Sequence, residues 1–125
     1  MNVPENLRYT DQHEWLKSED GEVRVGITDY AQDALGDVVF VDLPDTGIEI
    51  AIGEAIAEVE STKSVAEVYA PLAGKIVDVN TPLADNPEVI NSDPYGEGWF
   101  VLIAPSNIGD LDGMLDAEGY RSLTE

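Results

Sequence analysis

The residues whose types and spacing could support chemistry gather around one lysine. Residues 58–68 read EVESTKSVAEV, two alternating stretches that meet at Thr62 and Lys63. Such stretches predict two short strands joined by a tight turn. The turn contains no Asn-Gly or Asp-Gly pair, which would make a tight hairpin easy to form, so turn propensity does not explain these residues. Lys63 is one of only 6 Lys and Arg residues and is predicted to project from the hairpin tip.

Three interpretations of this lysine are open at this point. Lys63 can be a solvated residue that protects the strand ends. Ser61 and Lys63 can instead form a hydrolase dyad, in which the lysine accepts the hydroxyl proton. A dyad requires a lysine that loses its charge by burial, whereas an acidic, exposed hairpin tip favours the ammonium form. In the third interpretation the exposed amine is an acylation site, presented to a modifying enzyme and converted into a tether.

Other acidic motifs point to no metal and no catalytic residue. Asp110-Leu111-Asp112-Gly113 resembles part of a calcium loop. When Gly113 is aligned with loop position 6, Ile108 and Gly119 fall at the obligatory ligand positions, which excludes the site. With 26 Asp and Glu residues, suggestive carboxylate pairs are expected by chance.

His13-Glu14-Trp15 at the start of a predicted strand is the other chemically interesting group. Alternation along a strand places Glu14 on the opposite face from His13 and Trp15. We expect Glu14 to stand beside a cleft. A lone histidine, by contrast, is more often a structural hydrogen-bonding residue than a catalyst.

Composition excludes several classes of function. The 125 residues carry a formal net charge of −20 and are 43% hydrophobic, which predicts one folded domain over 1–125. So acidic a chain is a poor binder of nucleic acid or anionic membranes. It has no cysteine and one histidine, so it lacks a thiolate and a multi-histidine site. The start resembles no signal or transit peptide, so we expect a cytoplasmic protein, or a mitochondrial matrix protein if the chain is a trimmed mature form.

Short alternating segments separated by Gly, Pro and Asp predict a mainly β fold, a flattened barrel or sandwich, over about 8–104. The expected strands are 13–17, 23–27, 38–43, 55–61, 64–69, 74–79 and 99–104. One short helix is expected over 28–35, with Thr28 as N-cap and Gly36 at its C-terminal end. The last segment, about 106–125, is predicted to form short helices weakened by three glycines.

Several blocks in order resemble the H proteins of the glycine cleavage system, a family of lipoyl carriers, over nearly the whole chain. The blocks are HEW at 13–15, VGITDYAQDALGDVVFVDLP at 25–44, ESTKS at 60–64 and INSDPYGEGW at 90–99. Gly47 and Gly74 stand 16 residues before and 11 residues after Lys63, the offsets at which lipoyl domains carry glycines. Biotin carriers have Met on both sides of their lysine, whereas this chain has Thr62 and Ser64.

The resemblance implies a barrel-sandwich hybrid fold and lipoate attached covalently to Lys63, flanked by Glu60, Ser61, Thr62 and Ser64. It implies a non-catalytic, monomeric carrier that takes the aminomethyl group of glycine from a pyridoxal-phosphate decarboxylase. The carrier delivers it to a tetrahydrofolate-dependent aminomethyltransferase and is reoxidised by dihydrolipoamide dehydrogenase. A lipoate-attaching enzyme is the fourth partner. A carrier of the same fold used for lipoate relay is the alternative, and a Ser-Lys hydrolase is a remote one.

The resemblance also implies a cleft in which the loaded arm is sheltered. A cationic, hydrolysable adduct needs an anion in a place that water does not reach. Glu14 is the first choice for that carboxylate and Glu67 the second. One departure from the family is clear. Members commonly have a histidine near Tyr30 or Ala34, and this chain has none there.

Overall fold

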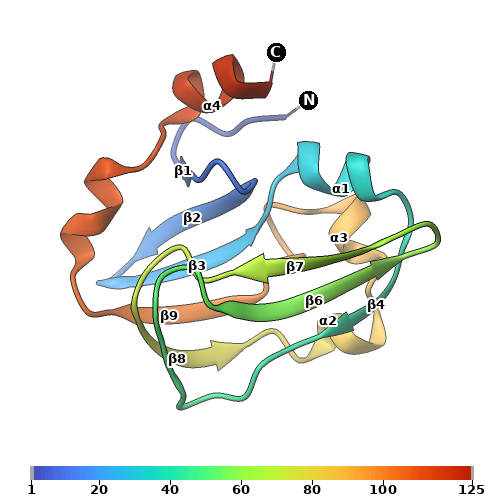
Figure 1. Ribbon diagram of the computed structural model, residues 1–125, viewed down its shortest axis with the longest axis horizontal. Coiled ribbons are helices and arrows are strands. Elements are labelled where there is room, and N and C mark those ends of the chain that lie inside the picture. The colour runs from blue at the N-terminus through green and yellow to red at the C-terminus, as the bar shows by residue number, and fades with distance from the viewer. Residues whose placement is uncertain (1, 125) are drawn as a thin grey trace.

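The computed structural model describes residues 2–124, which form a mainly β protein of two antiparallel sheets with a few short helices (Figure 1). This confirms the predicted fold class. The larger sheet has the order β1 (Arg8–Tyr9), β2 (Glu14–Glu19), β3 (Glu22–Ile27), β9 (Val101–Pro105), β8 (Gly74–Val79), β5 (Glu49–Ile50). The smaller sheet has the order β4 (Val38–Asp42), β6 (Ala55–Ser61), β7 (Val65–Tyr69).

The main core lies between the two sheets. Leu16, Val25 and Ile103 of the larger sheet belong to the same buried cluster as Val41 and Val59 of the smaller one. Alternation explains this arrangement, because every second residue of each strand faces the opposing sheet.

A second, smaller core lies on the other face of β2. It is formed by Val3, Leu7, Tyr9, Trp15, Ala117 and Tyr120, so the two ends of the chain pack together there. Trp15 lies opposite Gly26, where an added Cβ would come within 2.7 Å of the indole ring. Glycine is required at that position because only glycine leaves room for the ring. The first half of β2, Glu14 to Leu16, is therefore buried on both faces, whereas Lys17 and Ser18 are exposed.

The helix α1 (Asp29–Leu35) lies between β3 and β4, as predicted. Its N-cap is Thr28, whose hydroxyl oxygen accepts a hydrogen bond from the Ala31 N–H at 3.2 Å. Gly36 ends the helix with φ of +87°, and its N–H donates to the Gln32 carbonyl. Capping residues at both ends therefore fix the length of α1.

Four short elements were not expected from the sequence: β1, β5, α2 (Pro82–Asp85) and α3 (Val89–Ser92). Each has two to four residues, too few to show a periodic pattern. The expected C-terminal helices are a 3₁₀ helix over Ile108–Gly113 and α4 (Ala117–Thr124).

Some strand boundaries also differ from the predicted ones. The predicted strand 13–17 begins at Glu14, because His13 has a φ of +66° that no strand accommodates. The strand expected over 99–104 is Val101–Pro105.

Candidate functional site

The β6–β7 hairpin presents Lys63 at its tip. The turn is closed by a hydrogen bond from the Ser61 N–H to the Ser64 carbonyl at 2.8 Å. The Ser61 hydroxyl oxygen also accepts hydrogen bonds from the backbone N–H groups of Ser64, at 3.0 Å, and Lys63, at 3.3 Å. The contact between Ser61 and Lys63 therefore involves the lysine backbone and not its amine. Ser61 shapes the turn, which is the role of a structural hydroxyl and not of a nucleophile.

The Lys63 side chain is exposed and lies across the end of α1. A Cβ atom built on Gly36 would lie 3.2 Å from Lys63 Cε, so the lysine stem passes directly over the Gly36 backbone. Neither of the two ion pairs within residues 2–124 involves Lys63. The residues predicted to flank Lys63 lie around the turn. Thr62 and Ser64 are exposed at the tip, and Glu60 is half-buried in β6. The amine is accessible to a modifying enzyme.

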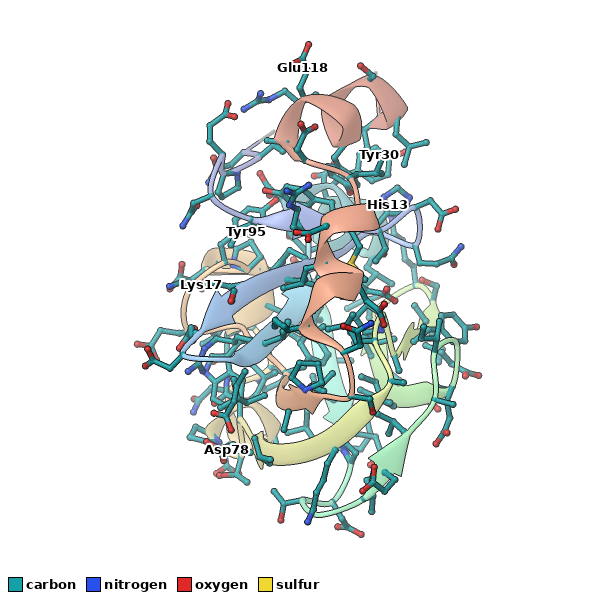
Figure 2. All side chains as sticks on the ribbon, turned by 90° about the vertical axis from the view of Figure 1, so that its left-hand side faces the viewer. His13, Lys17, Tyr30, Asp78, Tyr95 and Glu118 are labelled. Atoms are coloured by element: carbon teal, nitrogen blue, oxygen red, sulfur yellow. The ribbon has the colours of Figure 1, made fainter. Side chains whose placement is uncertain are left out.

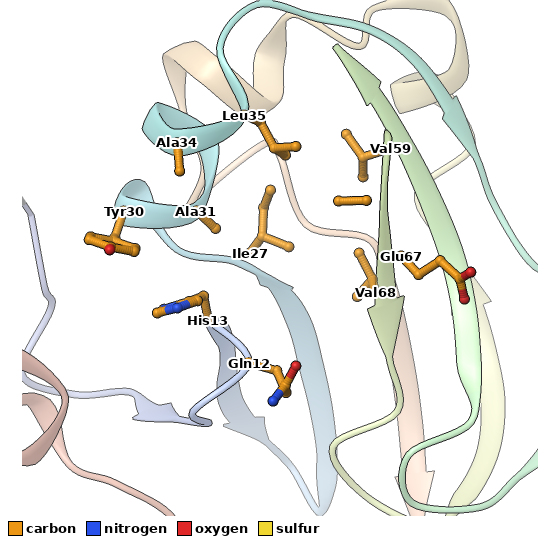
Figure 3. A pocket seen from close by; sticks show the side chains of 11 residues that line it. Gln12, His13, Ile27, Tyr30, Ala31, Ala34, Leu35, Val59, Glu67 and Val68 are labelled. Atoms are coloured by element: carbon orange, nitrogen blue, oxygen red, sulfur yellow. The ribbon is translucent and has the colours of Figure 1, made fainter. Parts of the chain in front are cut away.

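A cavity of about 240 Å³ lies beside this hairpin, between α1 and the inner face of β6 and β7 (Figure 3). Its apolar walls include Ile27, Ala31 and Leu35 on one side and Val59, Ala66 and Val68 on the other. The cavity begins close to the lysine, since Leu35 directly precedes the Gly36 backbone that the Lys63 stem crosses. A long apolar chain on Lys63 therefore has an apolar space within its neighbourhood.

His13 supplies an imidazole to the cavity wall, together with Gln12 and Tyr30. Its Nδ1 is hydrogen-bonded to the Tyr120 hydroxyl at 2.8 Å, and that hydroxyl is 2.7 Å from the Thr28 hydroxyl. The His13 ring also packs on Tyr30, with a centroid distance of 4.7 Å (Figure 2). Burial lowers the pKa of His13, which favours the neutral imidazole at pH 7. The C-terminal helix thus fixes a polar group at the cavity.

Glu14 is buried beneath the cavity wall and does not line the cavity. Its side chain is only 2% exposed, whereas we expected it beside a cleft. One carboxylate oxygen accepts from the Thr10 hydroxyl at 2.9 Å, and the other accepts from the Tyr69 N–H at 3.0 Å. Burial raises the pKa of Glu14 to about 7, although both hydrogen bonds act in the opposite direction. Glu14 thus joins β2 to β7 through its hydrogen bond with Tyr69. The residues next to these two in the chain, His13 and Val68, both line the cavity.

Glu67 contributes to the cavity wall from β7, but its carboxylate points away from the other lining side chains (Figure 3). Its cross-strand partner is Glu58, which in turn pairs with Asp42. These three carboxylates form a row on the outer face of the smaller sheet. The structure therefore does not bring the two predicted acids, Glu14 and Glu67, together at one site.

Two contributions to the cavity were not predicted from the sequence: Gln12 lines it, and Tyr120 holds the His13 ring in its wall. No local signal could reveal Tyr120, because its partners His13 and Thr28 are 107 and 92 residues away. Tyr30 and Ala34, near which the sequence comparison with the family expects a histidine, both line the cavity. That departure from the family was the sequence signal that pointed to this part of α1. In the part of the chain that the structure describes, no group of three or more His, Cys, Asp or Glu residues is placed to hold a metal ion. No helix within residues 2–124 is long and apolar enough to cross a bilayer.

Comparisons with known proteins agree with this geometry. The family described as Glycine cleavage H-protein matches residues 7–125. A Glycine cleavage system H protein of Thermus thermophilus is 54% identical over 125 residues, which is 100% of this chain and 98% of the relative. One of Bacteroides fragilis is 48% identical over 123 residues, covering 98% of each chain. The crystal structure of a glycine cleavage system H protein from Mycobacterium marinum superimposes with a TM-score of 0.89 at 44% identity, covering 98% of each chain. The chain therefore belongs to the glycine cleavage H-protein family.

Proposed function

We propose that this protein works as a carrier whose moving part is lipoate in amide linkage to Lys63. As a member of the glycine cleavage H-protein family, the chain is a lipoyl carrier of the glycine cleavage system. The observation that carries the assignment to Lys63 is its position at a hairpin tip, where the backbone and Ser61 close the turn and leave the amine exposed. When bound, lipoate would supply a disulfide, the sulfur chemistry needed to carry the aminomethyl group of glycine.

The residues present fit such a group. The chain has no cysteine of its own, so a sulfur-containing arm adds chemistry that the side chains lack. Amide formation removes the charge of the lysine, and the neutral arm then meets the apolar walls of the cavity beside α1. Gln12, His13 and Tyr30 are the polar side chains available there, and the apolar side chains of Ala31 and Leu35 reduce the access of water. The cavity is the proposed shelter of the loaded arm.

Glu14 is the proposed anion of this shelter, and it acts from beneath the wall. Each carboxylate oxygen accepts one hydrogen bond, from Thr10 or from Tyr69, and can accept a second, so an ammonium group that reached the carboxylate would displace neither donor. A nearby cation favours the ionised carboxylate and would therefore lower the raised pKa of Glu14. Glu67 is the weaker candidate, because its carboxylate faces the outer side of the sheet.

The proposed partners are the pyridoxal-phosphate decarboxylase, the tetrahydrofolate-dependent aminomethyltransferase, dihydrolipoamide dehydrogenase and the enzyme that attaches lipoate. The chain is proposed to be non-catalytic: it positions and protects the arm while its partners do the chemistry. A tether of this kind keeps the intermediate at high effective concentration for each partner in turn. The net charge of −20 favours association with basic partner surfaces, an attraction that salt weakens.

The test is a reconstituted exchange of labelled bicarbonate into glycine, with the decarboxylase as the enzyme and the lipoylated protein as its substrate. We expect exchange to require both lipoylation and Lys63. Lys63→Arg should abolish it, and the matched variant Lys75→Arg, in β8, should behave like the parent. A protein that is fully lipoylated on Lys63 and yet supports no exchange would contradict the carrier function and favour a lipoate-relay role.

A further inference from the structure

Residues 90–99, INSDPYGEGW, do not touch Lys63, but Asn91 of this block lies behind the hairpin tip. We propose that Asn91 is a positioning residue for Lys63. It acts without touching the lysine, by holding residues 36–38 in the place where the hairpin tip rests on them. The proposal depends on the proposed function, since it concerns the attachment of lipoate to Lys63.

The Asn91 side chain, from α3, binds residues 32–38 at three points. Its Nδ2 donates to the Gly36 carbonyl at 2.9 Å and to Gln32 Oε1 at 2.9 Å. Its Oδ1 accepts from the Val38 N–H, also at 2.9 Å. The orientation of the amide is fixed, because a backbone carbonyl can only accept and a backbone N–H can only donate. One side chain therefore holds the backbone on both sides of Asp37.

This segment is also the one that the hairpin tip contacts. The Thr62 N–H donates to the Asp37 carbonyl at 3.0 Å, and Val38 is paired with Ser61 in the sheet. Figure 1 shows the chain leaving α1 beside the tip of the β6–β7 hairpin. The chain of contacts therefore runs from Asn91 to residues 36–38, then to Thr62, and so to the backbone of Lys63.

Gly36 makes the close approach of the lysine possible. Its φ of +87° and ψ of −157° belong to a region that only glycine adopts readily. An added Cβ would lie 3.2 Å from Lys63 Cε and 3.7 Å from Nζ. The Gly36 backbone is thus a flat surface beneath the lysine stem, and Asn91 holds its carbonyl.

Position matters for the chemistry at Nζ. In lipoate attachment from a lipoyl adenylate, the amine forms a C–N bond with the lipoyl carbonyl carbon as the bond from that carbon to the phosphate oxygen breaks. AMP leaves, and the lysine ammonium gives up two protons in becoming the amide nitrogen. The amine of a flexible lysine must be held where it can approach the face of the carbonyl carbon, and orientation of reacting groups strongly affects the rate. Displacement of the turn should therefore slow attachment while leaving the affinity of the attaching enzyme for lipoate unchanged.

The experiment compares Asn91→Asp with Asn80→Asp. Each substitution removes two donated hydrogen bonds of one asparagine, because Asn80 Nδ2 donates to the Glu97 and Trp99 carbonyls at 2.7 Å each. We expect kcat/KM for lipoylation by a lipoate ligase to fall about ten-fold in Asn91→Asp and to stay within about two-fold in Asn80→Asp. Hydrogen exchange at the Thr62 amide should speed up in the first variant alone.

A second pair keeps the proposal testable if Asn91→Asp does not fold. Gly36→Ala places a methyl group under the lysine, whereas Gly53→Ala, at a φ of +84°, meets no atom within 4 Å. Both variants have the strain of a positive φ, and only the first should slow lipoylation. A parent rate in folded Asn91→Asp would overturn the proposal, and if that variant does not fold, a parent rate in Gly36→Ala would overturn it. Lipoylation that persists in Lys63→Arg would instead overturn the assignment of the attachment site.

Discussion

The tip of the β6–β7 hairpin and the second core, which is built around the stacked rings of Tyr9 and Tyr120 and is called the aromatic corner below, are held by different interactions. At the tip, residues 62–64 are exposed, and backbone and hydroxyl hydrogen bonds hold the turn. In the corner, Tyr9 and Tyr120 are fully buried and stacked with centroids 4.7 Å apart. A lysine that several enzymes must reach has to stay outside the core, whereas a wall that shelters the arm has to be rigid. The difference between the regions matches the two tasks of a carrier.

The two regions are linked by α1. Its N-cap, Thr28, contacts the Tyr120 hydroxyl in the corner, and its C-terminal Gly36 lies beneath Lys63. The face of the helix between them, with Ala31 and Leu35, lines the cavity. The helix therefore joins the attachment site to the shelter. Substitutions in the corner are therefore expected to affect stability, whereas those at the tip are expected to affect attachment and transfer.

The largest expected effect is on stability in the corner. Tyr120→Ala removes a fully buried ring and its hydrogen bonds, and should lower the free energy of unfolding by about 3 to 5 kcal/mol. Val65→Ala, beside the tip and 58% exposed, should change it by less than about 0.5 kcal/mol. Urea denaturation of the two variants measures both values. Equal losses would show that the corner is no more tightly packed than the tip.

The next effect concerns the buried carboxyl that joins the sheets. The pKa of Glu14 rises from 4.5 to about 7 on folding, so the folded state binds more protons than the unfolded state between those pH values. Its contribution to stability should therefore decrease as the pH rises through that window, by a few kcal/mol in all at about 1.4 kcal/mol per unit.

The comparison variant for this pH effect is Glu14→Gln, which cannot ionise. The free energy of unfolding of the parent, relative to that of Glu14→Gln, should fall from about pH 4.5 to about pH 7 and then level off. Denaturation curves at a series of pH values give this difference. A difference that is constant or that grows with pH would contradict the burial argument.

Glu14 and Glu67 should also differ in protection of the loaded arm. If the Glu14 carboxylate holds the ammonium by a charge-assisted hydrogen bond, Glu14→Gln should speed non-enzymatic release of ammonia and formaldehyde about ten-fold. Glu67→Gln should release them at the parent rate, since its carboxylate points outward. Release from the purified loaded carrier can be followed directly. Equal rates in the parent and both variants would place the shelter elsewhere.

The smallest effect is expected for Ser61→Ala. The hydroxyl accepts two backbone hydrogen bonds at an exposed turn, where water can replace it at a cost of about 1 kcal/mol or less. The lipoylated variant should support glycine decarboxylation within about two-fold of the parent. Loss of decarboxylation despite complete lipoylation would show that the hydroxyl does more than shape the turn.

The sequence predicted most of what depends on local pattern. The alternation of apolar and polar residues located β6 and β7. The turn between them lacks the usual turn-forming residues, and this drew attention to Lys63. Burial that depends on a distant partner was not predictable. Alternation places Glu14 on one face of β2, but nothing local shows that Tyr69 of the other sheet covers that face. The corner escaped prediction for the same reason, because Tyr120 meets His13 only in the folded chain.

The proposed carrier function requires that lipoate be attached to Lys63 alone. Incubation with a lipoate ligase, followed by proteolysis and mass spectrometry of the peptides, tests it directly. We expect one lipoyl group per chain, located on Lys63, with Lys17 and Lys75 unmodified and no addition to Lys63→Arg. A lipoyl group on either of the other two lysines, or undiminished modification of Lys63→Arg, would contradict it.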